Sequence, residues 1–130
     1  MIEGLRVVLG ADPRIAYALV FGSSVRGTMH PHSDVDVAIG MIDARRLDLM
    51  ELGELRSKLQ AAAGRPVDLV LLEEAPPGLA YRVFRHGRLI FARDERALAA
   101  RRARAILEYL DFRPIEELCA QGVLTAANGR

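Results

Sequence analysis

The sequence predicts an α/β (α+β) domain in which helices pack on a small mixed sheet. Short apolar runs that are typical of strands alternate along the chain with segments whose apolar residues recur at helical spacing. Glycine and proline separate these segments, and no internal repeat or low-complexity tract interrupts them. With 130 residues, of which 51% are hydrophobic, the chain is expected to form one domain around a core of aliphatic side chains.

The first half of the chain predicts two helices and three strands. Gly64 is a suitable residue to end the second helix, and Gly40 is suitable to end the second strand. The third strand is apolar at nearly every position around Asp68, which predicts burial on both of its faces. The expected helices cover residues 2–10 and 47–63, and the expected strands cover residues 15–21, 35–39 and 67–72.

The second half of the chain predicts a long helix near the C-terminus. Asp94 is a favourable N-cap for this helix. Because Pro114 lacks a backbone N–H and cannot continue a helix, the long helix is expected to end near Leu110. Residues 79–86 and 115–124 are further expected helices, and residues 89–92 an expected short strand.

These elements predict a single domain over residues 1–113, of which the C-terminal helix forms about residues 94–113. Residues 114–130 would form a short C-terminal tail. The long helix carries an apolar stripe that includes Leu98 and Ile106. We expect this stripe to pack in the core, with a protein interface as the alternative.

A Gly-Ser turn follows the first expected strand. Gly22 has no Cβ, so its backbone can approach a phosphate group closely. Backbone N–H groups and the Ser23 hydroxyl can donate hydrogen bonds to phosphate oxygens, and Arg26 could add a charge-assisted contact. Gly22, Ser23 and Arg26 are therefore candidate nucleotide-binding residues for a triphosphate.

Asp34, Asp36 and Asp68 are the candidate catalytic residues and metal ligands. Residues i and i+2 of a strand point to the same face, so Asp34 and Asp36 are expected to project side by side. Two close carboxylates repel each other unless cations neutralise them. Mg²⁺ favours carboxylate and phosphate oxygens, and two such ions can clamp the attacking and leaving oxygens of a phosphoryl transfer. Asp68 would complete the set as a ligand of the catalytic metal or as the base for the incoming hydroxyl.

The pattern Gly22-Ser23, ten residues, Asp34-x-Asp36 and a later strand aspartate resembles the DNA polymerase beta-type nucleotidyltransferase superfamily. The fuller match over residues 21–37 is similar to its minimal members (MNT), and to the antitoxins among them that are encoded beside a HEPN-domain ribonuclease toxin. The resemblance implies the polymerase beta-type nucleotidyltransferase fold, two Mg²⁺ ions on the three aspartates, and ATP as substrate. It also implies transfer of AMP to a tyrosine hydroxyl of the partner toxin, which silences the toxin.

Two alternatives stay open at the level of the sequence. The first is transfer of AMP to a small molecule such as an aminoglycoside, although the chain is short for a dedicated lid over a small substrate. The second is a non-catalytic antitoxin that neutralises its toxin by binding. Pure binding predicts that Asp34→Ala still neutralises the partner, whereas the enzyme hypothesis predicts that it does not.

Composition argues against several other classes of protein. The net charge of +1 argues against direct nucleic-acid binding, which usually needs a strongly basic chain. The single cysteine, Cys119, excludes an internal disulfide and a cysteine-based zinc site, and it fits a cytoplasmic location. No apolar run reaches the length of a membrane span, and the N-terminus lacks a signal-peptide pattern.

One segment departs from this balance of charge. Residues 82–104 carry eight arginines and only two acids, Asp94 and Glu95. This excess predicts a solvated helix face, or alternatively an electropositive rim for a triphosphate tail or for an acidic partner.

Overall fold

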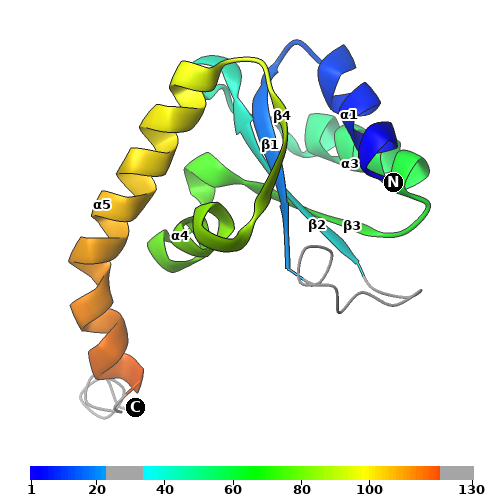
Figure 1. The fold of residues 1–130 in the computed structure, drawn as a ribbon. Helices are drawn as coiled ribbons and strands as arrows, with labels where there is room; N and C mark the ends of the chain where they lie inside the picture. The colour runs from blue at the N-terminus through cyan, green and yellow to red at the C-terminus, as the bar shows by residue number, and fades with distance from the viewer. Residues whose placement is uncertain (23–33, 121–130) are drawn as a thin grey trace.

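The computed structural model describes residues 1–22 and 34–120 of the chain, and these residues form a four-stranded mixed sheet with helices on both faces (Figure 1). The mixed sheet with helices packed on it is thus confirmed. In chain order the elements are α1 (Ile2–Ala11), β1 (Ile15–Phe21), β2 (Val35–Met41), η1 (Ile42–Ala44), α3 (Leu49–Ala63), β3 (Val67–Leu71), η2 (Leu72–Glu74), α4 (Pro77–His86), β4 (Arg88–Ala92) and α5 (Glu95–Ala120), where η denotes a 3₁₀ turn.

The sheet has the strand order β3-β2-β1-β4. β1 is antiparallel to β2 and β4, whereas β2 and β3 run parallel. The two central strands are almost entirely buried. The prediction that the third strand is buried on both faces is wrong, because β3 lies at the edge of the sheet and only Val67 among its five residues is fully buried.

Two hydrophobic clusters, one on each face of the sheet, hold the helices in place. The helices α1 and α3 contribute Leu5, Leu9, Leu55 and Leu59 to the first cluster. The helices α4 and α5 contribute Ala80, Val83, Leu98 and Ala105 to the second. Because successive strand residues point to opposite faces, the central strands supply side chains to both clusters.

Gly40 lies inside β2 and does not end it, contrary to expectation. The ring of Tyr17 covers this residue, and a Cβ added at Gly40 would overlap the ring. Burial in this position raises the pKa of Tyr17 to about 12. Glycine is therefore required here by the close approach of a side chain from the neighbouring strand, and β2 continues to Met41.

Helix α5 passes through Pro114, so the prediction that it ends near Leu110 is wrong. Proline in a helix removes one backbone hydrogen bond and crowds the preceding turn, at a cost of about 3 kcal/mol. An ion pair between Arg113 and Glu117, at 3.7 Å, joins the residues on either side of the proline. The separate helix expected over residues 115–124 is instead the last part of α5 as far as Ala120, and its remaining residues lie outside those described.

Helix α3 begins at Leu49 because Asp48 is its N-cap. The carboxylate of Asp48 accepts a hydrogen bond from the backbone N–H of Glu51 at 2.7 Å, and the Glu51 carboxylate accepts one from the backbone of Asp48 at 3.1 Å. Glu51 also accepts a bond from Arg14 at 3.1 Å, and Arg14 donates to both carboxylate oxygens of Asp12 at 2.9 and 2.6 Å. This network ties the turn between α1 and β1 to the start of α3.

We predict that Asp12→Asn lowers the free energy of unfolding by about 1 kcal/mol at neutral pH. The hydrogen bonds from Arg14 hold the pKa of the Asp12 carboxyl below its ordinary value of 3.8. The contribution of the ion pair is therefore complete above about pH 3.8 and is lost as the pH falls through the lower pKa of the folded state. Urea denaturation of both proteins across this range should show their stabilities converging in acid. A constant difference down to the lowest pH would contradict this role for Asp12.

Candidate active site

The candidate site lies where β1 ends and β2 begins. Asp36 of β2 is the register partner of Phe21 in β1 on one side and of Asp68 in β3 on the other. Neighbouring residues in register project from the same face of a sheet, so the carboxylates of Asp36 and Asp68 share a face. This is the face covered by α4 and α5, since Ala38 and Val70, two residues further along β2 and β3, belong to the second cluster.

Gly22 lies beside Asp36 in the candidate site. Its backbone is in the left-handed region, with φ of +73°, immediately after β1. A Cβ added at this position would overlap the carboxylate of Asp36. The left-handed backbone favours glycine here, and any larger residue would displace the Asp36 carboxylate, so the structure brings together the turn and the aspartate that the sequence singled out.

The other two aspartates are placed differently from the expectation. Asp68 is exposed, so the prediction of a buried carboxylate is wrong, and the reason is the edge position of β3. Asp34 is also exposed and precedes β2, so it does not share the regular strand geometry of Asp36. Val35 donates a backbone hydrogen bond to Pro66 at 2.9 Å, which anchors the entry to β2 beside the entry to β3.

The arrangement offers oxygen ligands for a hard cation. Within residues 1–22 and 34–120, no three or more His, Cys, Asp and Glu side chains are gathered as a complete metal site. Mg²⁺ is commonly held by one or two protein carboxylates together with substrate phosphates and water, so a complete protein cage is not required. The in-register pair Asp36 and Asp68 fits that coordination, and Asp34 lies two residues before Asp36.

Two of the predicted nucleotide-binding residues, Ser23 and Arg26, lie outside the described residues. Their expected contacts with a triphosphate stay predictions.

The arginines of residues 82–104 divide into two groups. Arg93 donates to backbone carbonyls of Gly10 and Ile15, Arg101 is buried and donates to Leu72 at 2.9 Å, and Arg104 pairs with Glu73 at 3.0 Å. These three are structural. The others are exposed, and they comprise Arg82, Arg85, Arg88, Arg96 and Arg102.

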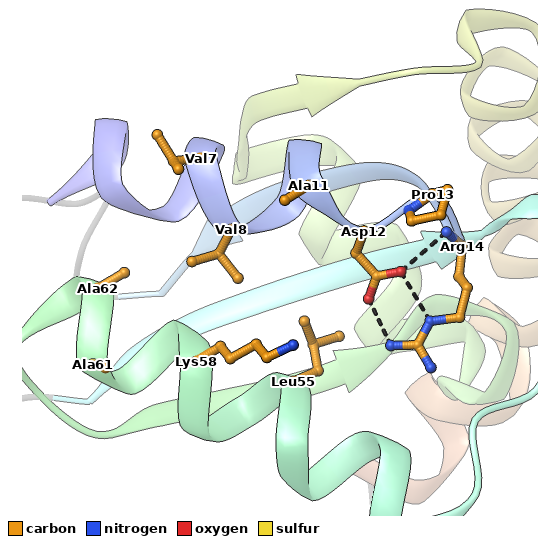
Figure 2. Close-up of a pocket in the computed structure, with 10 residues that line it drawn as sticks. All are labelled: Val7, Val8, Ala11, Asp12, Pro13, Arg14, Leu55, Lys58, Ala61 and Ala62. Carbon is orange, nitrogen blue, oxygen red and sulfur yellow. Dashed lines mark hydrogen bonds and ion pairs between the residues drawn. The ribbon is translucent and has the colours of Figure 1, made fainter.

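A groove of about 750 Å³ lies on the opposite face of the sheet, between α1 and α3 (Figure 2). Its walls are mostly apolar, and the Lys58 side chain lies along it. Asp12 and Arg14 close one end through their ion pair. Since the carboxylates of Asp36 and Asp68 project from the other face, this groove is separate from the candidate site.

Comparison with known proteins shows the family to which this chain belongs. The family model described as Polymerase beta, Nucleotidyltransferase matches residues 3–96, and the chain belongs to this family. A relative, the protein adenylyltransferase MntA of Shewanella oneidensis, is 34% identical over 83 residues, which cover 64% of this chain and 58% of that protein. The matched segment thus spans less than two thirds of the length of that relative.

Solved structures confirm the polymerase beta-type fold. A chain of a toxin–antitoxin crystal structure with AMP-PNP superposes with a TM-score of 0.81 at 26% identity, over 95% of this chain and 98% of that one. A chain from the complex of a tri-AMPylated Shewanella oneidensis HEPN toxin with an MNT antitoxin gives a TM-score of 0.73 at 22% identity, over 95% and 99% of the two chains.

None of the described helices combines the length and apolarity needed to cross a bilayer.

We predict that Gly22→Ala weakens the binding of Mn²⁺, used as a probe for a divalent cation, by about tenfold or more, because the added methyl group displaces the Asp36 carboxylate. Gly64→Ala is the matched control: Gly64 has a φ of +71°, and nothing lies within 4 Å of the added Cβ. Both variants should lose about 1 kcal/mol of stability from left-handed strain. Electron paramagnetic resonance titration would measure the affinities, and equal values for the two variants would contradict the proposed contact.

Proposed function

We propose that this chain is a Mg²⁺-dependent nucleotidyltransferase that moves AMP from ATP to a tyrosine hydroxyl of a HEPN-type toxin and thereby acts as its antitoxin. The observation that carries the proposal is the contact of Gly22 with Asp36 and the register of Asp36 with Asp68. The 34% identity to a protein adenylyltransferase and the likeness to a toxin–antitoxin chain solved with AMP-PNP, an ATP analogue, support it.

The residues of this chain would act mainly by positioning and charge. Asp34, Asp36 and Asp68 would hold two Mg²⁺ ions, which supply neutralisation of the negative charge on the triphosphate. The turn that begins at Gly22 lets the backbone approach the phosphates, with Ser23 and Arg26 as further donors. Asp68 is exposed, so it is accessible to an incoming hydroxyl and could accept its proton.

The reaction is a displacement at the α-phosphorus of ATP. The acceptor hydroxyl oxygen forms a bond to that phosphorus while the bond to the bridging oxygen of pyrophosphate breaks. The hydroxyl proton passes to a base, for which Asp68 is the candidate, and pyrophosphate leaves. The product is a phosphodiester between the acceptor and AMP. Positioning of the two reactants and neutralisation of the developing charge together would supply most of the rate enhancement in such a transfer.

The proposed function is tested by intact-protein mass spectrometry. A HEPN-type toxin encoded beside this chain would be incubated with the chain, ATP and Mg²⁺, and with the double variant Asp34→Ala/Asp36→Ala as control. A gain in toxin mass by one or more AMP units, absent with the double variant, is the expected result. A stable complex without any gain would instead favour the non-catalytic antitoxin. No complex and no gain would favour a small-molecule acceptor of the aminoglycoside type.

We predict that Asp36→Asn lowers the rate of AMP transfer by roughly 100-fold or more, which is about 3 kcal/mol of transition-state stabilisation. The amide keeps the shape of the side chain beside Gly22 but removes the negative charge, and circular dichroism should show that the variant stays folded. Glu54→Gln is the matched control, because Glu54 is an exposed acid on α3. Comparable transfer rates for Asp36→Asn and the wild-type protein would contradict a catalytic role.

A further inference from the structure

The helices α4 and α5 form an exposed surface that the catalytic site does not use. Six residues define this α4–α5 surface: Tyr81, Phe84, Arg85, Arg102, Ile106 and Leu110. The first five line a depression of about 380 Å³. Ile106 and Leu110, one helical turn apart on α5, are 42% and 51% exposed. The expectation that the apolar stripe of this helix packs in the core therefore holds for Leu98 but not for these two residues.

Ring contacts join the two helices of this surface. The rings of Tyr81 and Tyr109 stack with centroids 4.1 Å apart and an interplanar angle of 10°, which fixes α5 against α4. The guanidinium of Arg102 lies 5.7 Å from the ring centroid of Phe84. Beneath them, the second cluster buries Val83 and Ala105 completely. These contacts reduce the conformational entropy that the aromatic side chains and Arg102 would lose on binding.

Helices α4 and α5, which carry the α4–α5 surface, pack on one face of the sheet (Figure 1). The carboxylates of Asp36 and Asp68 project from this same face. The α4–α5 surface also lies towards the same end of the sheet. Helix α4 ends at His86, and Arg88, at the start of β4, pairs with Val20, two residues before Gly22. A protein that presents a hydroxyl to the carboxylates can therefore contact this surface in the same complex.

We propose that the α4–α5 surface docks the acceptor protein, with Ile106 and Leu110 against an apolar ridge of that protein and Arg85 and Arg102 against its acidic side chains. This inference rests on the proposed function, since it assigns the docking site of the same toxin. The lining residues of the depression include two arginines and no acid, so the complementary surface is acidic.

The composition of the α4–α5 surface favours an acceptor protein over two other possible partners, a second copy of this chain and nucleic acid. A second copy of this chain in a two-fold interface would bring together two surfaces that both carry arginines and no acid among the lining residues, which is unfavourable. Nucleic acid favours polar and basic surfaces, whereas exposed aliphatic side chains lie beside the arginines here. An apolar centre with a charged rim is the arrangement typical of a protein interface.

The test compares Ile106→Glu and Arg102→Glu with Leu49→Glu, a control at an 88% exposed position on α3. Toxin binding by calorimetry and the kinetics of AMP transfer would be measured for each. We expect both surface variants to raise KM for the toxin by about tenfold or more with kcat nearly unchanged, because docking is lost and the catalytic groups are intact. Affinity for Mg²⁺ and AMP-PNP, measured without toxin, should equal that of the wild type and confirms that the variants are folded.

The outcomes separate this inference from the proposed function. If the wild-type chain modifies the toxin and Ile106→Glu does so with an unchanged KM, the docking assignment is overturned and the enzymatic function stands. If the wild-type chain neither binds nor modifies the toxin, the proposed function fails and the docking assignment fails with it. If sedimentation shows that Ile106→Glu abolishes self-association while toxin affinity is unchanged, the surface belongs to a second copy and the inference is again overturned.

Discussion

The hydrogen-bonded register of three strands is the constraint on which the site depends. Phe21 in β1, Asp36 in β2 and Asp68 in β3 are aligned across the sheet, and Gly22 turns away from β1 at the level of the Asp36 carboxylate. A slip of one residue in either pairing would move a carboxylate to the opposite face, into the core that α1 and α3 cover. The chemistry therefore depends directly on the apolar pattern that sets the register.

The two faces of the sheet differ in how fully the helices cover them. On one face, α1 and α3 pack closely, and the network of Asp12, Arg14 and Glu51 fixes their relative position. On the other face, α4 and α5 cover β1 but leave Asp68 exposed at the edge. The edge of the sheet at β3 is therefore open, and a hydroxyl and a triphosphate could meet the carboxylates there.

Local sequence patterns predicted the elements well where local interactions decide them. The limits of β1 were predicted to the residue, and Gly64 ends α3 in the left-handed conformation expected of a helix-ending glycine. Three predictions failed because tertiary structure decided the outcome. Gly40 accommodates a ring from another strand, β3 is an edge strand although its sequence is nearly all apolar, and α5 continues through Pro114. The order of strands in the sheet is not encoded in any single segment.

The candidate site, too, could be predicted from the sequence only in part. The motif in the sequence identified Gly22, Asp36 and Asp68, and the structure places them together through the register. Spacing along a strand could not place Asp34, which precedes β2, nor could it show that Asp68 is exposed. The charge excess of residues 82–104 could not be divided from sequence into arginines with structural partners, such as Arg101, and exposed ones.

The most direct test of the central claim is a crystal structure of this chain with AMP-PNP and Mn²⁺, using anomalous scattering to locate the metal. The account predicts Mn²⁺ peaks beside the carboxylates of Asp36 and Asp68, on the face of the sheet that α4 and α5 cover, with the triphosphate against the turn at Gly22. A nucleotide bound elsewhere, for example in the groove between α1 and α3, with no metal at Asp36, would contradict it.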